Sequence, residues 1–143
     1  MAWLCDCRID GLRNIETMEL DGFARINLIQ GLNGAGKTSV LEAISLLGLG
    51  RSFRYQKHRP LINHHLDHLS VQGSVRKNPH DILKSPIRVL KSRKNSESLI
   101  ELQNKRCLSA ADLAAVLPLQ LIDSESFDRV QGQPDFLLQF VYW

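Results

Sequence analysis

Residues 31–38 read GLNGAGKT, and this stretch decides what kind of fold the rest of the chain has to build. The spacing matches the pattern G-x-x-x-x-G-K-[ST], in which a glycine-rich turn leads from a strand into a helix and its backbone N–H groups surround phosphate oxygens. Its members are all candidates for contact with a nucleotide: Gly31, Leu32, Asn33, Gly34, Ala35, Gly36, Lys37 and Thr38. The pattern therefore predicts a phosphate-binding loop between a strand and a helix.

The residue types in this loop suit a negatively charged ligand. Glycine adopts positive φ without strain and leaves no Cβ between the backbone and a phosphate. Successive N–H groups then converge on an anion, and the following helix adds unpaired N–H groups and the positive end of its dipole. Lys37 is expected to reach the β- and γ-phosphates, and the Thr38 hydroxyl to hold Mg²⁺. The predicted cofactors are a nucleoside triphosphate and Mg²⁺.

The segments on either side of the loop predict the strand and the helix that such a loop joins. Residues 24–30 (ARINLIQ) form a dense apolar run, which is typical of a strand covered on both faces. Residues 37–47 predict an amphipathic helix. Its apolar stripe consists of Val40, Leu41, Ala43, Ile44 and Leu47, while Ser39, Glu42 and Ser45 lie mostly on the opposite face. Together these segments predict an α/β fold.

Shorter segments predict a sheet around this unit, within one domain that spans residues 1–143. The predicted strands are residues 2–9 and 17–20, and an antiparallel set at 69–75, 87–91 and 98–102. Ser109, with Asp112 three residues later, predicts the start of a short helix over 109–117. Residues 119–122 predict a last short strand.

Composition excludes several classes of protein. Of the 143 residues, 43% are apolar, which is too many for a disordered chain. No apolar run approaches the roughly 20 residues of a membrane helix, and Asp6 and Arg8 interrupt the N-terminal segment, so we expect a cytoplasmic protein without membrane contact. Cys5 and Cys7, two residues apart in a predicted strand, are expected to be core positions on one face with Trp3 and Ile9.

Four histidines and one aspartate are further candidates for metal binding. His58, His64, His65 and His68 have no carboxylate or cysteine nearby in sequence to complete a site, which favours a polar loop. Asp123 follows the apolar residues 119–122. It fits either a carboxylate that holds Mg²⁺ or a solvated turn after an edge strand.

A basic run is the only feature of the charge distribution that points to a partner. The net charge is +3, and the run contains Lys84, Arg88, Lys91, Arg93 and Lys94, followed by Lys105 and Arg106. Such a run can neutralise the phosphates of a nucleic acid. A solvated hairpin edge, protected from pairing by its lysines, explains it equally well.

Three segments resemble the N-terminal portion of the RecF family, bacterial recombination and replication-repair ATPases of the SMC/ABC type. They are LRNIE at 12–16, INLIQGLNGAGKTSVLEAI at 26–44 and GRSFR at 50–54. The resemblance continues more thinly through LPLQLI at 117–122 and GQP at 132–134. It runs along the whole chain but over only the first half or less of the family's length. The family's signature segment, its Walker B strand with an acidic pair, its helical lobe and its C-terminal half are not found in this sequence.

The resemblance implies the N-terminal lobe of an ABC/SMC-type ATPase head, with a mixed sheet. It implies binding of ATP with Mg²⁺, an ATP-dependent homodimer, and binding of single-stranded or gapped DNA together with other recombination mediators, in support of recombinase loading. Without the signature segment, ATP turnover by this chain is expected to be small. The alternatives are a non-catalytic DNA-binding module with a vestigial phosphate loop, or a head fragment of another SMC-like ATPase.

The resemblance also implies roles for residues outside the loop. Arg13 and Asn14, in the turn after the first strand, are expected near the nucleotide. Gln120 corresponds either to a switch-like glutamine or to a polar residue on an edge strand. Arg51 and Arg54 either face phosphates or stabilise a loop.

Overall fold

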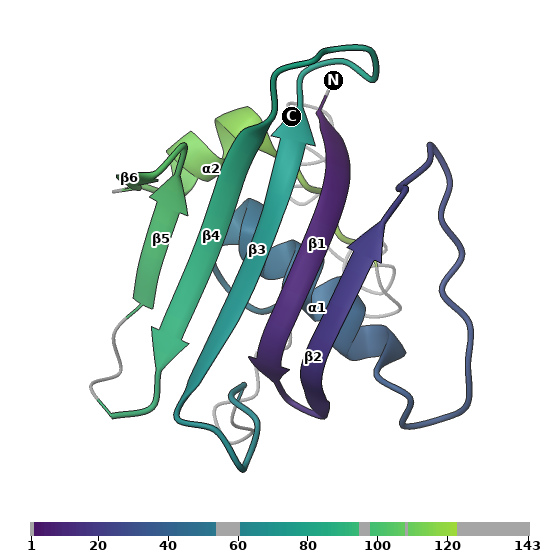
Figure 1. The fold of residues 1–143 in the computed structure, drawn as a ribbon, viewed down its shortest axis with the longest axis vertical. Coiled ribbons are helices and arrows are strands. Elements are labelled where there is room, and N and C mark those ends of the chain that lie inside the picture. The colour runs from purple at the N-terminus through teal and green to yellow at the C-terminus, as the bar shows by residue number, and fades with distance from the viewer. Residues whose placement is uncertain (1, 54–60, 95–97, 108, 123–143) are drawn as a thin grey trace, which may run out of the picture.

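The computed structural model describes residues 2–53, 61–94, 98–107 and 109–122, which form one sheet with two helices behind it (Figure 1). The elements in chain order are β1 (Trp3–Leu12), β2 (Ile15–Asp21), α1 (Lys37–Leu49), β3 (His68–Arg76), β4 (Ser85–Ser92), β5 (Ser98–Leu102), β6 (Lys105–Arg106) and α2 (Ala110–Val116). The strand order is β2-β1-β3-β4-β5-β6, and each neighbouring pair is antiparallel. In this part of the chain no helix is long and apolar enough to cross a membrane.

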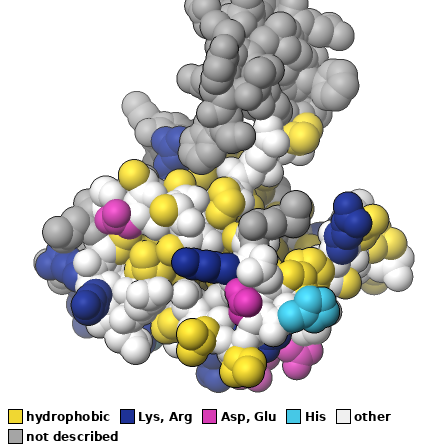
Figure 2. All heavy atoms as spheres, turned by 90° about the horizontal axis from the view of Figure 1, so that it is seen from above, with side chains coloured by type: hydrophobic (Ala, Val, Ile, Leu, Met, Phe, Trp, Pro, Cys, Tyr) yellow, Lys and Arg dark blue, Asp and Glu magenta, His cyan; other side chains and the backbone are white. Residues whose placement is uncertain are grey.

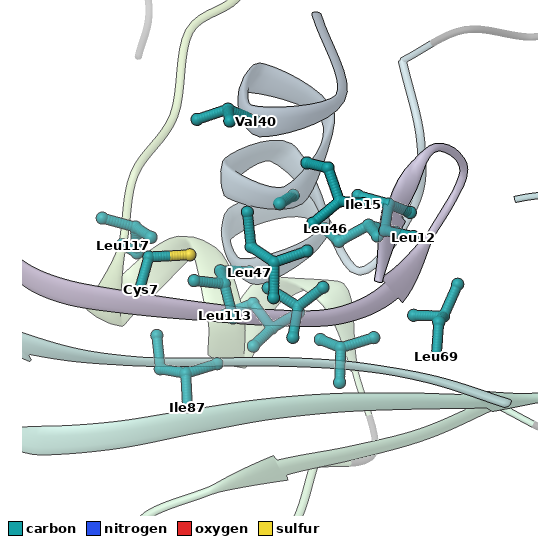
Figure 3. Close-up of a cluster of buried hydrophobic side chains, with 14 of the residues drawn as sticks. Cys7, Leu12, Ile15, Val40, Leu46, Leu47, Leu69, Ile87, Leu113 and Leu117 are labelled. Atoms are coloured by element: carbon teal, nitrogen blue, oxygen red, sulfur yellow. The ribbon is translucent and has the colours of Figure 1, made fainter. Parts of the chain in front are cut away.

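Apolar side chains fill the space between the sheet and the helices. In register, Ile9 of β1 lies opposite Val71 of β3, and Val71 lies opposite Val89 of β4; all three are fully buried. Figure 3 shows side chains from both layers that meet in this core, among them Leu46, Leu47, Leu69, Ile87 and Leu113. A row of branched apolar residues across the central strands is what an antiparallel sheet with one covered face requires.

The other face of the sheet carries polar residues at the alternate positions. Arg8 lies opposite Gln72, Gln72 opposite Arg88, and Arg88 opposite Glu101. Arg8 also makes ion pairs within its own hairpin, to Asp10 and Glu19. The period-two pattern of the strands thus separates a core face from a solvated face.

The structure places β3, β4 and β5 on three of the segments expected to be strands, and α2 within the expected short helix. The Ser109 hydroxyl accepts the N–H of Asp112, as its N-terminal position predicts. Strand β6 was not foreseen. It depends on Gln103 and Asn104, whose φ angles of 52° and 62° form the two-residue turn that closes a tight hairpin.

The expectation of a buried strand at residues 24–30 is wrong for the described chain. The segment makes an extended connection beyond the edge strand β2 (Figure 1). Ile26 is 87% exposed and Leu28 84% exposed. Local bonds between the Asn27 side chain and the backbone of Ala24 shape the segment instead. An apolar run becomes a buried strand only where other strands pair with it, and none of the described strands does.

The expected polar face of the first helix is also wrong. Glu42 and Ser45 of α1 are 0% exposed, whereas Leu41 is 46% exposed. The Ser45 hydroxyl donates to the Glu42 carbonyl at 2.8 Å, and the Glu42 carboxylate binds Arg13. The spacing of apolar residues predicts the wrong buried face because Glu42 and Ser45 both make hydrogen bonds within the protein and can therefore be buried.

A bulge in β1 corrects the expectation for Cys5. Opposite β3, Leu4 pairs with Val75 but Asp6 already pairs with Ser74, so one extra residue lies between them. Cys7 is 1% exposed, as expected of a core position, while Cys5 is half-buried and Leu4 packs against the core. The bulge shifts the alternation of core-facing and solvent-facing side chains by one residue, so that Leu4 and not Cys5 packs against the core.

The last predicted strand is absent as well. Residues 119–122 are irregular, and Gln120 and Ile122 are exposed. Pro118 follows the end of the preceding helix, and residues 119–122 pair with none of the described strands.

Candidate phosphate-binding site

Two glycines give the loop its shape. Gly34 and Gly36 have φ angles of 84° and 94°, in the left-handed region that other residues seldom occupy. A Cβ on Gly34 would meet nothing within 4 Å, so the space above this residue is open. Gly36 is buried where the loop passes beside the β1–β2 turn. A Cβ on Gly36 would therefore lie close to that turn, 3.4 Å from the Asn14 amide nitrogen.

The loop ends at the N-terminus of α1. Gly36 is the N-terminal cap, and the first backbone bond of the helix runs from the Val40 N–H to the Gly36 carbonyl at 3.0 Å. The N–H groups before Val40 therefore have no partner within the helix. No acidic residue in the first turn competes for the positive end of the helix dipole. This helix end is suited to an anion.

Lys37 brings a positive charge to the same place. Its ammonium donates to the carbonyls of Gly31 and Leu32, at 2.8 and 2.7 Å. The side chain is thus folded back over the loop, while Thr38 follows it, half-buried, in the first turn of α1. An ammonium held by loop carbonyls lies where a phosphate in the loop would need a counter-charge.

Asn14 reaches the loop from the turn between β1 and β2. Its amide nitrogen donates to the Gly34 carbonyl at 2.8 Å, and its amide oxygen accepts the Ser39 hydroxyl at 2.9 Å. One side chain therefore joins the middle of the loop to the first turn of α1. Sequence reasoning brought Asn14 to this neighbourhood but did not foresee either bond.

Arg13, by contrast, is directed to the side of the helix. Its guanidinium makes a two-point ion pair with Glu42, one bond of which is 2.9 Å, and the Ser52 hydroxyl donates to the same carboxylate. The Arg13 side chain is 13% exposed and that of Glu42 0%. Hydrogen bonding to Glu42 raises the pKa of Arg13 above its ordinary value. Sequence reasoning missed Glu42, although a glutamate within the apolar run VLEAISLL was a usable signal.

The remaining candidates make no contact with the loop that the described residues show. Gln120 is exposed; its neighbour Leu119 lies against Gly48 and lines the same cavity as Gly36 and Lys37. Arg51 is exposed and its carbonyl lies 3.4 Å from the Ser45 hydroxyl. Three candidates lie outside the described residues: Arg54, His58 and Asp123. Over the ranges that the structure describes, no three metal-binding side chains gather.

The basic run is largely occupied by partners within the molecule. Lys84 pairs with Asp6 at 3.3 Å, Arg88 with Glu101 at 3.7 Å and Lys94 with Asp67 at 3.3 Å. Arg93 donates to two backbone carbonyls, and burial lowers the pKa of Lys91. Seen from above in Figure 2, Lys and Arg side chains are scattered among acidic and hydrophobic ones. This distribution favours the solvated hairpin over a nucleic-acid patch.

Comparison with known proteins agrees with this geometry. Residues 4–133 match the family described as the RecF/RecN/SMC N terminal domain. The chain belongs to this family. The expected RecF resemblance and the ABC/SMC-type head fold are thereby confirmed.

Two similar proteins are both named DNA replication and repair protein RecF. The chain is 41% identical over 140 residues to the DNA replication and repair protein RecF of Cellvibrio japonicus, covering 98% of this chain and 38% of the relative. It is 39% identical over 136 residues to the RecF protein of a Marinomonas species, covering 94% of this chain and 36% of the relative. The chain therefore spans little more than a third of the length of these curated relatives.

Two solved structures have a similar fold. One, described as the recombination mediator protein RecF-ATP in the RecFOR pathway, has a TM-score of 0.77 at 26% identity, over 97% of this chain and 36% of the other. The second, described as RecF-ATPrS in the same pathway, has a TM-score of 0.68 at 31% identity, over 78% and 29% of the two chains.

Proposed function

We propose that this domain binds the phosphates of ATP at residues 31–38, as the N-terminal part of a RecF-type ATPase that acts in DNA replication and repair in the cytoplasm. The observation that carries the proposal is the Lys37 ammonium held over a glycine loop at the start of α1, 2.8 and 2.7 Å from two loop carbonyls. The similarity to a RecF structure described with ATP supports the same ligand.

The residues present fit a phosphate group. The space above Gly34 is open, the loop from Gly31 to Ala35 is exposed, and the helix N-terminus behind it has unpaired amides. In this proposal Lys37 exchanges its loop carbonyls for phosphate oxygens, and the Thr38 hydroxyl holds Mg²⁺. When bound, Mg²⁺ would neutralise charge on the β- and γ-phosphates.

Hydrolysis needs more than this loop supplies. A carboxylate must hold the metal and another group must position water. The sequence candidate Asp123 lies outside the described residues, and Glu42 is already bound to Arg13 and Ser52. We therefore propose that this chain binds ATP and turns it over slowly. For the full-length RecF-type protein we propose an ATP-dependent homodimer, contacts with other recombination mediators and support of recombinase loading.

Substituting Lys37 tests the proposal. We expect Lys37→Ala to weaken the Kd for a fluorescent ATP analogue with Mg²⁺ about ten- to hundredfold, because charged hydrogen bonds are worth about 1.5–3 kcal/mol. The matched control is Lys77→Ala, since Lys77 is exposed beyond the end of β3. Equal binding by the wild type and Lys37→Ala would refute the assignment.

DNA binding is tested separately by gel shift on single-stranded and gapped DNA over a salt series. Binding that requires ATP and is lost in Lys37→Ala is the expected result. Binding that ignores ATP and falls steeply with salt would favour a DNA-binding module with a vestigial phosphate loop.

A further inference from the structure

The Asn14 carboxamide uses both of its ends on the phosphate loop and the helix behind it. The amide nitrogen is 2.8 Å from the Gly34 carbonyl, and the amide oxygen is 2.9 Å from the Ser39 hydroxyl. Gly34 is the exposed, left-handed residue at the centre of the loop, and Ser39 is 5% exposed in the first turn of α1. The side chain thus links the exposed centre of the loop to a buried position in the first turn of α1.

The turn that carries Asn14 is itself firmly held. Arg13 has a φ of 51°, a conformation that a non-glycine residue keeps only when its surroundings impose it. Its N–H donates to the Leu61 carbonyl at 2.7 Å, and its guanidinium is paired with the buried carboxylate of Glu42. Ser52 donates to the same carboxylate. The β1–β2 turn is therefore attached both to α1 and to the segment that follows this helix.

We infer that Asn14 is a positioning residue of the phosphate loop, acting through the Gly34 carbonyl and not through contact with the nucleotide. The inference rests on the proposed ATP binding and adds to it the hydrogen bonds of Asn14 that hold the loop in its binding conformation. Glycine-rich loops lose much conformational entropy when they are ordered. A loop that is already held loses less on binding, which strengthens affinity. The Asn14 side chain is exposed, so its removal is expected to act on affinity more than on folding.

The two ends of the carboxamide can be separated by substitution. Asn14→Asp keeps an oxygen for the Ser39 hydroxyl but replaces the donor to Gly34 with a negatively charged oxygen. Ser39→Ala removes the other bond and leaves the donor to Gly34. Because the new carboxylate would also repel phosphate, Asn14→Ala is compared with Ser39→Ala as well: if positioning acts through Gly34, Asn14→Ala weakens binding more than Ser39→Ala. Asn78→Ala is the matched control, because Asn78 bonds Asp81 within the β3–β4 loop.

The experiment measures Kd for a fluorescent ATP analogue with Mg²⁺, using the full chain, and melting temperatures without ligand. We expect Kd to weaken about three- to tenfold in Asn14→Ala, through the loss of the bond to the Gly34 carbonyl, and about tenfold or more in Asn14→Asp. Ser39→Ala should lose less than Asn14→Asp, and Asn78→Ala should stay within about twofold of the wild type. Inorganic tripolyphosphate, used as a competitor, should weaken by the same factor as ATP.

Three results would overturn the inference while leaving ATP binding in place, provided that Lys37→Ala still loses affinity. They are wild-type affinity in Asn14→Ala, a larger loss in Ser39→Ala than in Asn14→Asp, and a loss for ATP with none for tripolyphosphate. The last result would mean that Asn14 contacts the nucleoside. Absence of binding by the wild type would overturn the proposed function itself, and the inference with it.

Discussion

At the scale of single residues, the Arg13–Glu42 pair is the contact that hydrophobic spacing hides. A charge on the packed side of α1 is tolerated because the guanidinium and the Ser52 hydroxyl both reach it. Removing one member of such a pair leaves the other buried without compensation, which is costly, whereas replacing both with apolar groups often is not.

We expect Glu42→Ala to lower the free energy of unfolding by about 1.5–3 kcal/mol, because the half-buried Arg13 guanidinium loses its charged hydrogen bonds. Replacing both residues, Arg13→Leu with Glu42→Leu, should recover most of the loss. Glu19→Ala, which breaks the exposed pair with Arg8, is the control and should leave the urea midpoint unchanged. A small effect of Glu42→Ala would mean that the pair contributes little to folding.

The buried thiol of Cys7 should make the free energy of unfolding fall at alkaline pH. Burial, with a smaller contribution from the charge of Asp6, raises the pKa of the Cys7 thiol to about 12 from 9.0. An acid whose pKa is higher in the folded state stabilises the fold fully below the unfolded pKa. That contribution is lost as the pH rises from about 9 to about 12.

Between pH 8 and pH 10, we expect this thiol to remove about 1.4 kcal/mol from the free energy of unfolding of the wild type. Cys7→Ala should lack that part of the pH dependence, because it has no group to titrate there. Urea unfolding of both proteins at the two pH values measures the difference. Parallel curves would show that Cys7 titrates alike in the folded and unfolded chains.

At the scale of elements, the segment between β2 and α1 is the unusual one. Ile26, Leu28 and Leu32 are each more than four-fifths exposed, at 87%, 84% and 84%. A cavity of about 690 Å³ lies beside this segment, bounded by Ile29, Leu41 and Ile44 among others. Exposed apolar surface of this kind promotes association.

Replacing these side chains should change association and leave folding intact. We expect Ile26→Lys with Leu28→Lys to alter the free energy of unfolding by less than about 0.5 kcal/mol, while light scattering shows fewer oligomers. Leu46→Ala is the contrast, because Leu46 is fully buried in α1 and its truncation should cost about 2–5 kcal/mol. Marked destabilisation by the double lysine variant would mean that the segment is packed in solution.

At the scale of the whole molecule, sequence and structure agree best where the pattern is local. The loop at 31–38, the helix that starts at Lys37 and strands β3 to β5 each have a recognisable pattern within their own residues, and the sequence predicted them, although β3 is paired with the distant strand β1. The sequence predictions were wrong where contacts with distant parts of the chain determine the structure of a segment. Residues 24–30 are apolar enough for a buried strand but have no described strand beside them, and a single bulge moved Cys5 off the core face.

The sequence by itself determined the glycine loop at 31–38 and the helix that follows it, since glycine conformations, a lysine and a helix start are properties of eight consecutive residues. Only the tertiary structure decided how that loop is supported. Asn14 and Gly34 are 20 residues apart in the chain, and Arg13 and Glu42 are 29 apart. Such pairs meet because the β1–β2 hairpin is set in register in the sheet and α1 packs against that sheet. Contacts of this length follow from packing, which no local pattern encodes.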